Sequence, residues 1–352
     1  MKTRLPKILL PIILLATIIT ITIFALSNFN KNTPNSSNLK IITTNFITYD
    51  LTRAVAGDHA DITMLLKPGT DAHAFEPTPK DIININNSDL FIYIGGESDG
   101  WVSNLLKDNE IDKNKVLRLM DEVTLKEEEI IEGMETTSSE LDSDHSTTDS
   151  DHSTTESDHA DHEDNHNEAH DHETTEIEYD EHIWTSIPNS IKLLDSISKK
   201  LSTIAPEYAS DFAANTRSYT DQLSSIDQSI RTLVVSAKNK HLVFADRFPF
   251  RYFVDEYDLT YSSAFPGCSE QTEASSSTIS YLIDKVKQNH LPVIFKIELT
   301  SDQLAQTISN ETGAKILEFS SAHNVSESDF NSGITYLDIL NKNLDALRQA
   351  LN

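Results

Sequence analysis

Cysteine and positive charge are both scarce in this chain of 352 residues. It has one cysteine, Cys268, which excludes an intramolecular disulfide framework and a zinc site made of four thiolates. It has 28 lysine and arginine residues against 56 aspartate and glutamate residues, so its net charge is −28. Because nucleic-acid phosphates require a basic surface, we expect no nucleic-acid partner. The same acidity is compatible with binding a cation.

Long apolar runs are also lacking, except at the N-terminus. Three basic residues within the first seven precede the apolar run from Ile8 to Leu26, an order that places the N-terminus in the cytoplasm. The run is close to a bilayer span and long for a signal-peptide core. Ala25-Leu26-Ser27 would suit a signal peptidase, but we favour an uncleaved membrane anchor over a cleaved signal peptide. Either interpretation places the chain after residue 30 outside the cytoplasmic membrane.

Histidine is concentrated in one short segment. Seven of the 13 histidines lie within 28 residues, in a stretch from Glu140 to Glu181 that has 17 acidic residues and no lysine or arginine. These seven are His145, His152, His159, His162, His166, His170 and His172. Imidazole and carboxylate groups bind divalent transition metals, so the segment is interpreted as a metal-collecting loop. The alternative is a solvated acidic linker in which the histidines are incidental.

This segment cannot bury enough apolar surface to fold alone, and we expect a disordered insert over about residues 133–178. His162 to His166 matches the HExxH pattern of metalloproteases. That pattern requires a helix to place both histidines on one face. The neighbouring residues are Asp, Asn, Ser and Thr, which offer no apolar face to hold a helix, so we interpret the match as chance.

Short apolar runs alternate with amphipathic segments on both sides of this insert, which is typical of α/β folds with mostly parallel sheets. Glu207 to Lys238 contains no proline or glycine and has apolar residues at helical spacing. It predicts a helix roughly 48 Å long that could join two lobes. We therefore expect two α/β lobes joined by a long rigid helix, with the binding site in the cleft between them. The expected parts are a signal or anchor (1–30), a tether (31–38), an N-terminal α/β lobe (39–185), a helical linker (186–238) and a C-terminal α/β lobe (239–352).

Three isolated histidines lie where ordered segments end or begin. His73 lies in a proline-rich loop after a predicted strand, His182 lies where order returns after the insert, and His323 follows a predicted strand of the second lobe. Each could be an ordinary loop residue when taken alone. Because ligands of α/β sheets sit at the carboxyl ends of strands, we expect the three to meet where the lobes face each other. Cys268 has no histidine partner that the sequence places, so we interpret it as a structural thiol.

At these residues the chain resembles the solute-binding proteins of zinc and manganese ABC importers. PGTDAHAFEPTPKDI (Pro68 to Ile82) is similar to the first ligand motif of that family, and EHIWTS (Glu181 to Ser186) is similar to the second, usually D-P-H-x-W-L-S. TYLDILNKNLDALRQAL (Thr335 to Leu351) is similar to the closing helix. A loop rich in His, Asp and Glu before the second motif is typical of the zinc-selective members. The resemblance covers residues 39–352 and implies that His73 and His182 bind metal.

The chain departs from the family pattern at the other two ligand positions. The alignment of FADRFPFRYF places Arg247, which cannot bind a metal ion, where the family has its third ligand. The fourth ligand is usually an acid in the loop after the last strand, and we expect His323 to replace it. Asp246 is a further candidate ligand. Glu270 and Glu298 are possible substitutes that the sequence does not place.

We therefore expect an extracytoplasmic protein, associated with the membrane by its N-terminal segment, that captures Zn²⁺ and delivers it to an ABC permease with its cytoplasmic ATPase. Imidazole ligands favour Zn²⁺, although Mn²⁺ is possible. The alternatives are an extracellular zinc store or adhesin and a zinc metallohydrolase. No general base is placed by the sequence, so we expect a binding protein and not an enzyme. We expect it to be a monomer.

Overall fold

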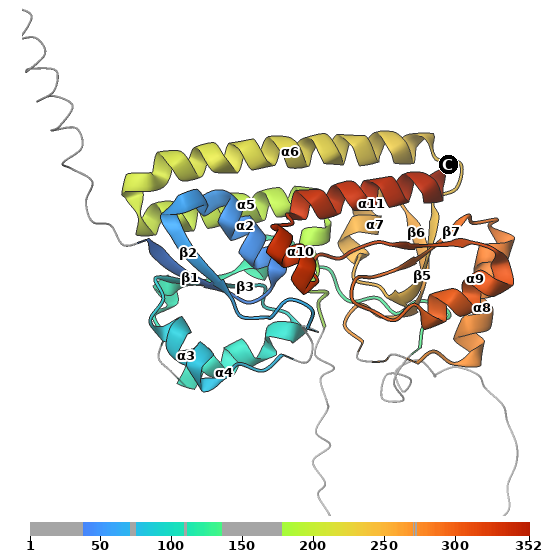
Figure 1. Ribbon diagram of the computed structural model, residues 1–352, viewed down its shortest axis with the longest axis horizontal. Coiled ribbons are helices and arrows are strands. Elements are labelled where there is room, and N and C mark those ends of the chain that lie inside the picture. Colours follow the sequence, from blue (N-terminus) through green and yellow to red (C-terminus); the bar gives the residue numbers. More distant parts are fainter. Residues whose placement is uncertain (1–37, 71–74, 109–110, 136–177, 270, 272) are drawn as a thin grey trace, which may run out of the picture. The chain divides into compact units, whose positions relative to one another are not determined.

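Two parallel sheets of four strands each form the framework of the protein (Figure 1). The computed structural model describes residues 38–70, 75–108, 111–135, 178–269, 271 and 273–352. The first sheet has the order β2-β1-β3-β4 and consists of β1 (Leu39–Thr43), β2 (Ala60–Met64), β3 (Leu90–Tyr93) and β4 (Val116–Arg118). The second has the order β6-β5-β7-β8 and consists of β5 (His241–Arg247), β6 (Thr260–Phe265), β7 (Val293–Lys296) and β8 (Lys315–Glu318). All pairs within the two sheets are parallel, so the predicted fold class is confirmed.

In the first lobe, which contains the first sheet, capping residues mark where two of the helices begin. Helix α2 (Phe46–Ala56) begins with a capping box of Asn45 and Thr48. Helix α3 (Pro79–Asn86) begins with proline, which suits the first helical position, and is capped by Thr78. The third helix of this lobe is α4 (Gly100–Asp108). Short 3₁₀ helices are η1 (Gly57–His59), η2 (Glu97–Asp99), η3 (Lys113–Lys115) and η4 (Leu119–Glu122).

The second lobe, which contains the second sheet, repeats this plan. Its helices are α7 (Arg251–Tyr257), α8 (Ser276–Gln288), α9 (Gln303–Thr312) and α10 (Glu327–Ser332). Helices α8 and α9 pack against each other and against strands of the second sheet. Residues from 126 to 135, which we expected to belong to the first lobe or to the insert, lie against the second lobe. Glu129 pairs with Arg251, and the amide of Glu135 donates to the carbonyl of Ala264 at 2.8 Å.

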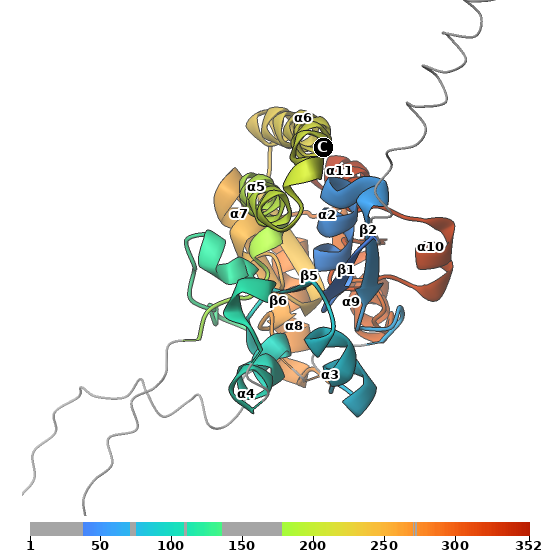
Figure 2. The same cartoon turned by 90° about the vertical axis from the view of Figure 1, so that its left-hand side faces the viewer.

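Three long helices pack together on one side of the two lobes, and one of them, α6, runs from the first lobe to the second (Figures 1 and 2). They are α5 (Ile187–Ile204), α6 (Ala209–Ser236) and α11 (Tyr336–Leu351), with η6 (Ile183–Thr185) before α5 and η7 (Pro206–Tyr208) before α6. Helix α6 has 28 residues and is therefore about 42 Å long. It packs on α2 and α5 beside the first sheet and on α7 and α11 beside the second. The predicted bridging helix is thus present. In the part of the chain that the structure describes, no helix is both long and apolar enough to cross a membrane.

One apolar core holds the two lobes together. It contains Ile41 of β1, Leu223 of α6 and Phe244 of β5, each with at most 1% of its surface exposed. Burial of a large apolar side chain stabilises a fold by roughly 1.5–3 kcal/mol. A core shared by both sheets therefore fixes the lobes relative to each other within residues 39–352, and it brings their facing loops to one place.

Candidate metal centre

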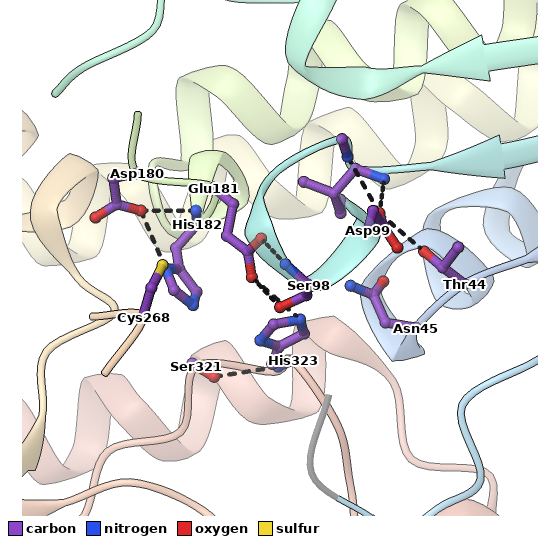
Figure 3. A network of polar contacts seen from close by, with 12 residues as sticks. Thr44, Asn45, Ser98, Asp99, Asp180, Glu181, His182, Cys268, Ser321 and His323 are labelled. Atoms are coloured by element: carbon purple, nitrogen blue, oxygen red, sulfur yellow. Dashed lines mark hydrogen bonds and ion pairs between the residues drawn. The ribbon is translucent and has the colours of Figure 1, made fainter. Parts of the chain in front are cut away.

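Three buried side chains with metal-binding atoms converge between the lobes (Figure 3). Glu181, His182 and His323 each offer one ligand atom, and these atoms all lie within 4.8 Å of one another. Nε2 of His323 is 3.8 Å from Oε1 of Glu181. The exposed fractions of the three residues are 1%, 1% and 8%, respectively. Two imidazoles and a carboxylate at this spacing can hold one divalent ion.

The orientation of the His182 ring is set by the residue two positions before it. Oδ1 of Asp180 accepts the backbone amide of His182 at 2.7 Å and lies 3.0 Å from Nδ1 of the same residue. The proton of the imidazole is therefore held at Nδ1, and Nε2 is left as the atom that can bind a metal. Carboxylates that fix histidine ligands in this way are usual around protein metal ions.

Glu181 is held by the loop that follows β3. The backbone amide of Ser98 donates to Oε2 of Glu181 at 2.9 Å, and the Ser98 hydroxyl donates to Oε1. Gly96 makes this approach possible, because a Cβ atom there would lie 2.1 Å from the Cβ of Glu181. Gly96, which follows β3, thus allows the Glu181 carboxylate to reach the centre.

His323 is placed by the loop after β8. Glu298, which is partly buried, accepts hydrogen bonds from the amide of Ser321 at 2.7 Å and from the amide of His323 at 3.2 Å. Nε1 of Trp184 donates to the carbonyl of Ser321 at 2.7 Å, and the Trp184 ring packs edge-on against His323 with centroids 5.2 Å apart. Ala322 has φ of 61°, so the loop takes a left-handed turn that residues with a Cβ atom seldom adopt. These contacts hold that turn and aim the imidazole toward Glu181.

The centre carries an excess of buried negative charge. Burial raises the pKa of Glu181, and neighbouring His182 and Ser98 offset only part of this rise. Burial lowers the pKa of His182, but Asp180 and then Glu181 raise it to a net value above the ordinary one. Burial, with Glu181 nearby, also raises the pKa of Asp99 to about 7. A divalent cation would relieve this repulsion, so the electrostatics favour metal binding.

A cavity of about 240 Å³ gives access to both imidazoles. Its walls come from both lobes and include His182, Arg247, Glu298 and His323. The loop at Gly69 and Thr70, which follows β2, closes one side. The predicted cleft between the lobes is therefore present, and Arg247 lines it at the position where the family usually has a third ligand.

Only some of the predicted site residues lie together in the part of the chain that the structure describes. His182 and His323 are brought together as expected. His73 and the seven histidines of the collecting loop lie outside the described residues. Asp246 is not part of the group, because its carboxylate accepts hydrogen bonds from the hydroxyl of Thr300 at 2.5 Å and from the amide of Ile297 at 3.2 Å. Its contacts belong to the second lobe.

Glu181 is the member of the group that sequence reasoning did not select. A signal for it was available, because an acidic residue stands directly before His182 where the family motif has proline. The glycine pair at 95–96 would by its sequence indicate only the end of a strand. The approach of that turn to Glu181 depends on tertiary structure, which the sequence does not show.

Cys268 lies beside the centre without joining it (Figure 3). Its side chain is buried, and its backbone amide donates to Oε1 of Glu128 at 2.9 Å. Burial raises the pKa of the thiol well above its ordinary value, and nearby Glu181 and Glu128 add to the effect. The thiol therefore stays protonated at neutral pH, in keeping with the structural role expected for it.

Known proteins resemble this chain over most of its described length. The family model of zinc-uptake complex component A, periplasmic (ZnuA), matches residues 41–350. The zinc-binding lipoprotein AdcA of Streptococcus pneumoniae strain R6 is 30% identical over 311 residues, which are 88% of this chain and 55% of that protein. The high-affinity zinc uptake system protein ZnuA of Bacillus subtilis strain 168 is 26% identical over 319 residues, which are 89% of this chain and 88% of that protein. This chain thus spans about half the length of the streptococcal protein and most of the Bacillus protein.

A solved structure agrees with these matches. The crystal structure of the Zn(II)-bound ZnuA-like domain of Streptococcus pneumoniae AdcA superposes with a TM-score of 0.67 and 27% sequence identity, over 90% of this chain and 99% of that one. The family model covers the two sheets, the bridging helix and all three converging side chains. The chain therefore belongs to the ZnuA family of periplasmic zinc-uptake components.

Proposed function

We propose that this protein captures Zn²⁺ outside the cytoplasm and delivers it to an ABC permease. The convergence of Glu181, His182 and His323 in the cavity between the lobes carries the proposal. Two imidazoles and one carboxylate suit Zn²⁺ better than Mn²⁺, which prefers more oxygen ligands. The family of the chain consists of components of zinc uptake and not of enzymes, which agrees with the expectation from the sequence.

The proposed ligands are Nε2 of His182, Nε2 of His323 and a carboxylate oxygen of Glu181. His73 is proposed as the fourth ligand on the resemblance of its motif alone. In the family pattern a third ligand stands at the position that Arg247 occupies in this chain. Glu181 is proposed to replace that ligand. Asp246 is left out of the proposed set, because its oxygens are used within the second lobe.

The proposed partners follow from the family. Its members are periplasmic components of a zinc-uptake complex, and we propose a permease with its ATPase as the partner of this chain. The N-terminal segment, whose residues lie outside those that the structure describes, is proposed as an uncleaved anchor that keeps the protein at the membrane. The histidine-rich loop is proposed to collect ions weakly and to pass them to the buried centre.

The first test is a metal competition titration of the full chain. A chromophoric chelator of nanomolar affinity suppresses weak binding by the histidine-rich loop, so that only the tight site is counted. We expect one tight Zn²⁺ per chain and a strong loss of affinity in His182→Ala and His323→Ala. Uptake of radiolabelled zinc by cells that lack the gene should be restored by the wild type and not by these variants. One tight zinc in both variants, or unchanged uptake, would contradict the proposal.

A further inference from the structure

The loop that carries His323 is bonded to the lobe opposite its own sheet. It follows β8 of the second sheet, yet the carbonyl of His323 accepts the amide of Phe46, at the start of α2, at 3.2 Å. The amide of Gly69 donates to the carbonyl of Val325 at 2.8 Å. The loop from Ser321 to Val325 is therefore a bridge between the two lobes at the metal centre.

Asn324, next to His323, bonds twice to the opposite lobe through its side chain. It is 3% exposed, and its Nδ2 donates to two carbonyls of the first lobe, those of Lys67 at 2.9 Å and of Thr70 at 2.7 Å. Its Oδ1 accepts the amide of Val325 at 2.8 Å. The two donors and the acceptor of one amide are all used, so the side chain has one orientation that satisfies every group.

The two carbonyls belong to the loop after β2, which lines the cavity from the side of the first lobe. Residues from Lys67 to Thr70 follow β2, and Gly69 and Thr70 line the cavity together with His323 and Asn324. Gly69 has φ of 81°, a conformation that glycine adopts without strain. The chain reaches His73, the proposed fourth ligand, three residues after Thr70. Asn324 therefore joins the two loops that flank the metal centre from opposite lobes.

We propose that Asn324 is a positioning residue that latches the Lys67–Thr70 loop onto the metal-binding loop, so that retention of zinc depends on it. The inference rests on the proposed function. If the loops separate, the buried Asn324 amide loses both of its carbonyl partners together, which favours the closed arrangement. Zinc bound to His323 fixes the adjacent Asn324, and a fixed Asn324 in turn holds the loop, so each contact strengthens the other.

Asn324→Asp gives the sharpest test, because two effects of that change have opposite signs. The carboxylate has the size of the amide but faces two carbonyl oxygens with no hydrogen to donate. Its negative charge beside the metal centre would by itself tighten the binding of a cation. We expect zinc to bind about tenfold or more weakly, mostly through faster dissociation. Asn324→Ala, which adds no charge, should weaken binding in the same direction.

Asn343→Asp is the matched control. Asn343 is also a buried asparagine whose amide bonds one neighbouring loop, since its Oδ1 accepts from the amide of Ser320 and its Nδ2 donates to the carbonyl of Ser320. Both bonds stay within the second lobe. This variant should lose stability as Asn324→Asp does, but its zinc dissociation rate should remain within about threefold of the wild type.

Hydrogen exchange of the Gly69 amide measures directly whether the two loops stay in contact, because this amide donates to the carbonyl of Val325 in the opposite lobe. We expect this amide of the zinc-free protein to lose protection in both Asn324 variants and to keep it in Asn343→Asp. Unchanged dissociation and unchanged protection in the Asn324 variants would overturn the proposal, as would equal effects in Asn343→Asp. If the wild type bound no zinc, the proposed function would fail, while Gly69 exchange would still decide whether the latch exists.

Discussion

Glu181→Gln should separate metal binding from stability, because the two are expected to change in opposite directions. Glutamine has the size of glutamate and retains an oxygen that can accept from the amide or the hydroxyl of Ser98. It removes the negative charge that lies 3.8 Å from Nε2 of His323. The change thus alters the charge of the centre while it preserves packing.

The loss in zinc affinity should be large. Removal of one partner of a buried charge pair costs roughly 2–5 kcal/mol, which corresponds to about a 30-fold to 4000-fold weaker affinity. The zinc-free protein should become more stable, because burial of the Glu181 carboxylate raises its pKa and its ionised form is costly. A gain of about 1 kcal/mol would raise the melting temperature by roughly 2–4 °C.

Chelator competition and thermal melting of the metal-free protein at pH 8 measure the two effects. Asp246→Asn is the control, because Asp246 is a buried carboxylate whose hydrogen bonds lie within the second lobe. Burial also raises the pKa of Asp246, so Asp246→Asn should change stability in the same direction as Glu181→Gln, but it should leave zinc affinity within about threefold of the wild type. An unchanged zinc affinity in Glu181→Gln would refute the assignment of Glu181 as a ligand. Loss of zinc binding in Asp246→Asn alone would show that the metal lies elsewhere.

Three further predictions concern the surroundings of the centre. Burial raises the pKa of Asp99 to about 7, so the free energy of unfolding of the metal-free wild type should fall as the pH rises from about 4 to 7. Asp99→Asn lacks this titration, so in urea unfolding its free energy of unfolding relative to that of the wild type should rise by about 3 kcal/mol between pH 5 and pH 8. An equal pH slope in both proteins would contradict this. His73→Ala should weaken zinc binding at least tenfold in chelator competition, and unchanged binding would remove His73 from the ligand set. Deletion of residues 140–176 should lower zinc stoichiometry and uptake at limiting zinc while the tight site remains, and unchanged uptake would exclude a collecting role.

Most elements of the fold could be predicted from local patterns. Helical spacing of apolar residues from Phe46 to Ala56, followed by Gly57, marks both ends of helix α2, which has those bounds. The strand β6 (Thr260–Phe265) was not predicted, since Tyr261 and two serines interrupt its apolar character. The two serines are nevertheless buried within the second sheet, where hydrogen bonds that a sequence pattern does not reveal satisfy their hydroxyls.

The site was predicted only where its residues have recognisable neighbours. His182 and His323 stand beside short motifs at the ends of ordered segments, and the structure places them with ring centroids 5.4 Å apart. Glu181 and Asn324 matter because of contacts with residues more than 80 positions away, such as Ser98 and Thr70. Long-range contacts of this kind depend on how the two lobes meet, so no local pattern predicts them.

Anomalous diffraction at the zinc absorption edge, from crystals of the full chain grown with one equivalent of zinc, tests the central claim most directly. The account predicts one strong peak about 2.0–2.2 Å from Nε2 of His182, from Nε2 of His323 and from a carboxylate oxygen of Glu181. A peak bound by other residues, with these three side chains more than 3 Å away from the ion, would contradict it.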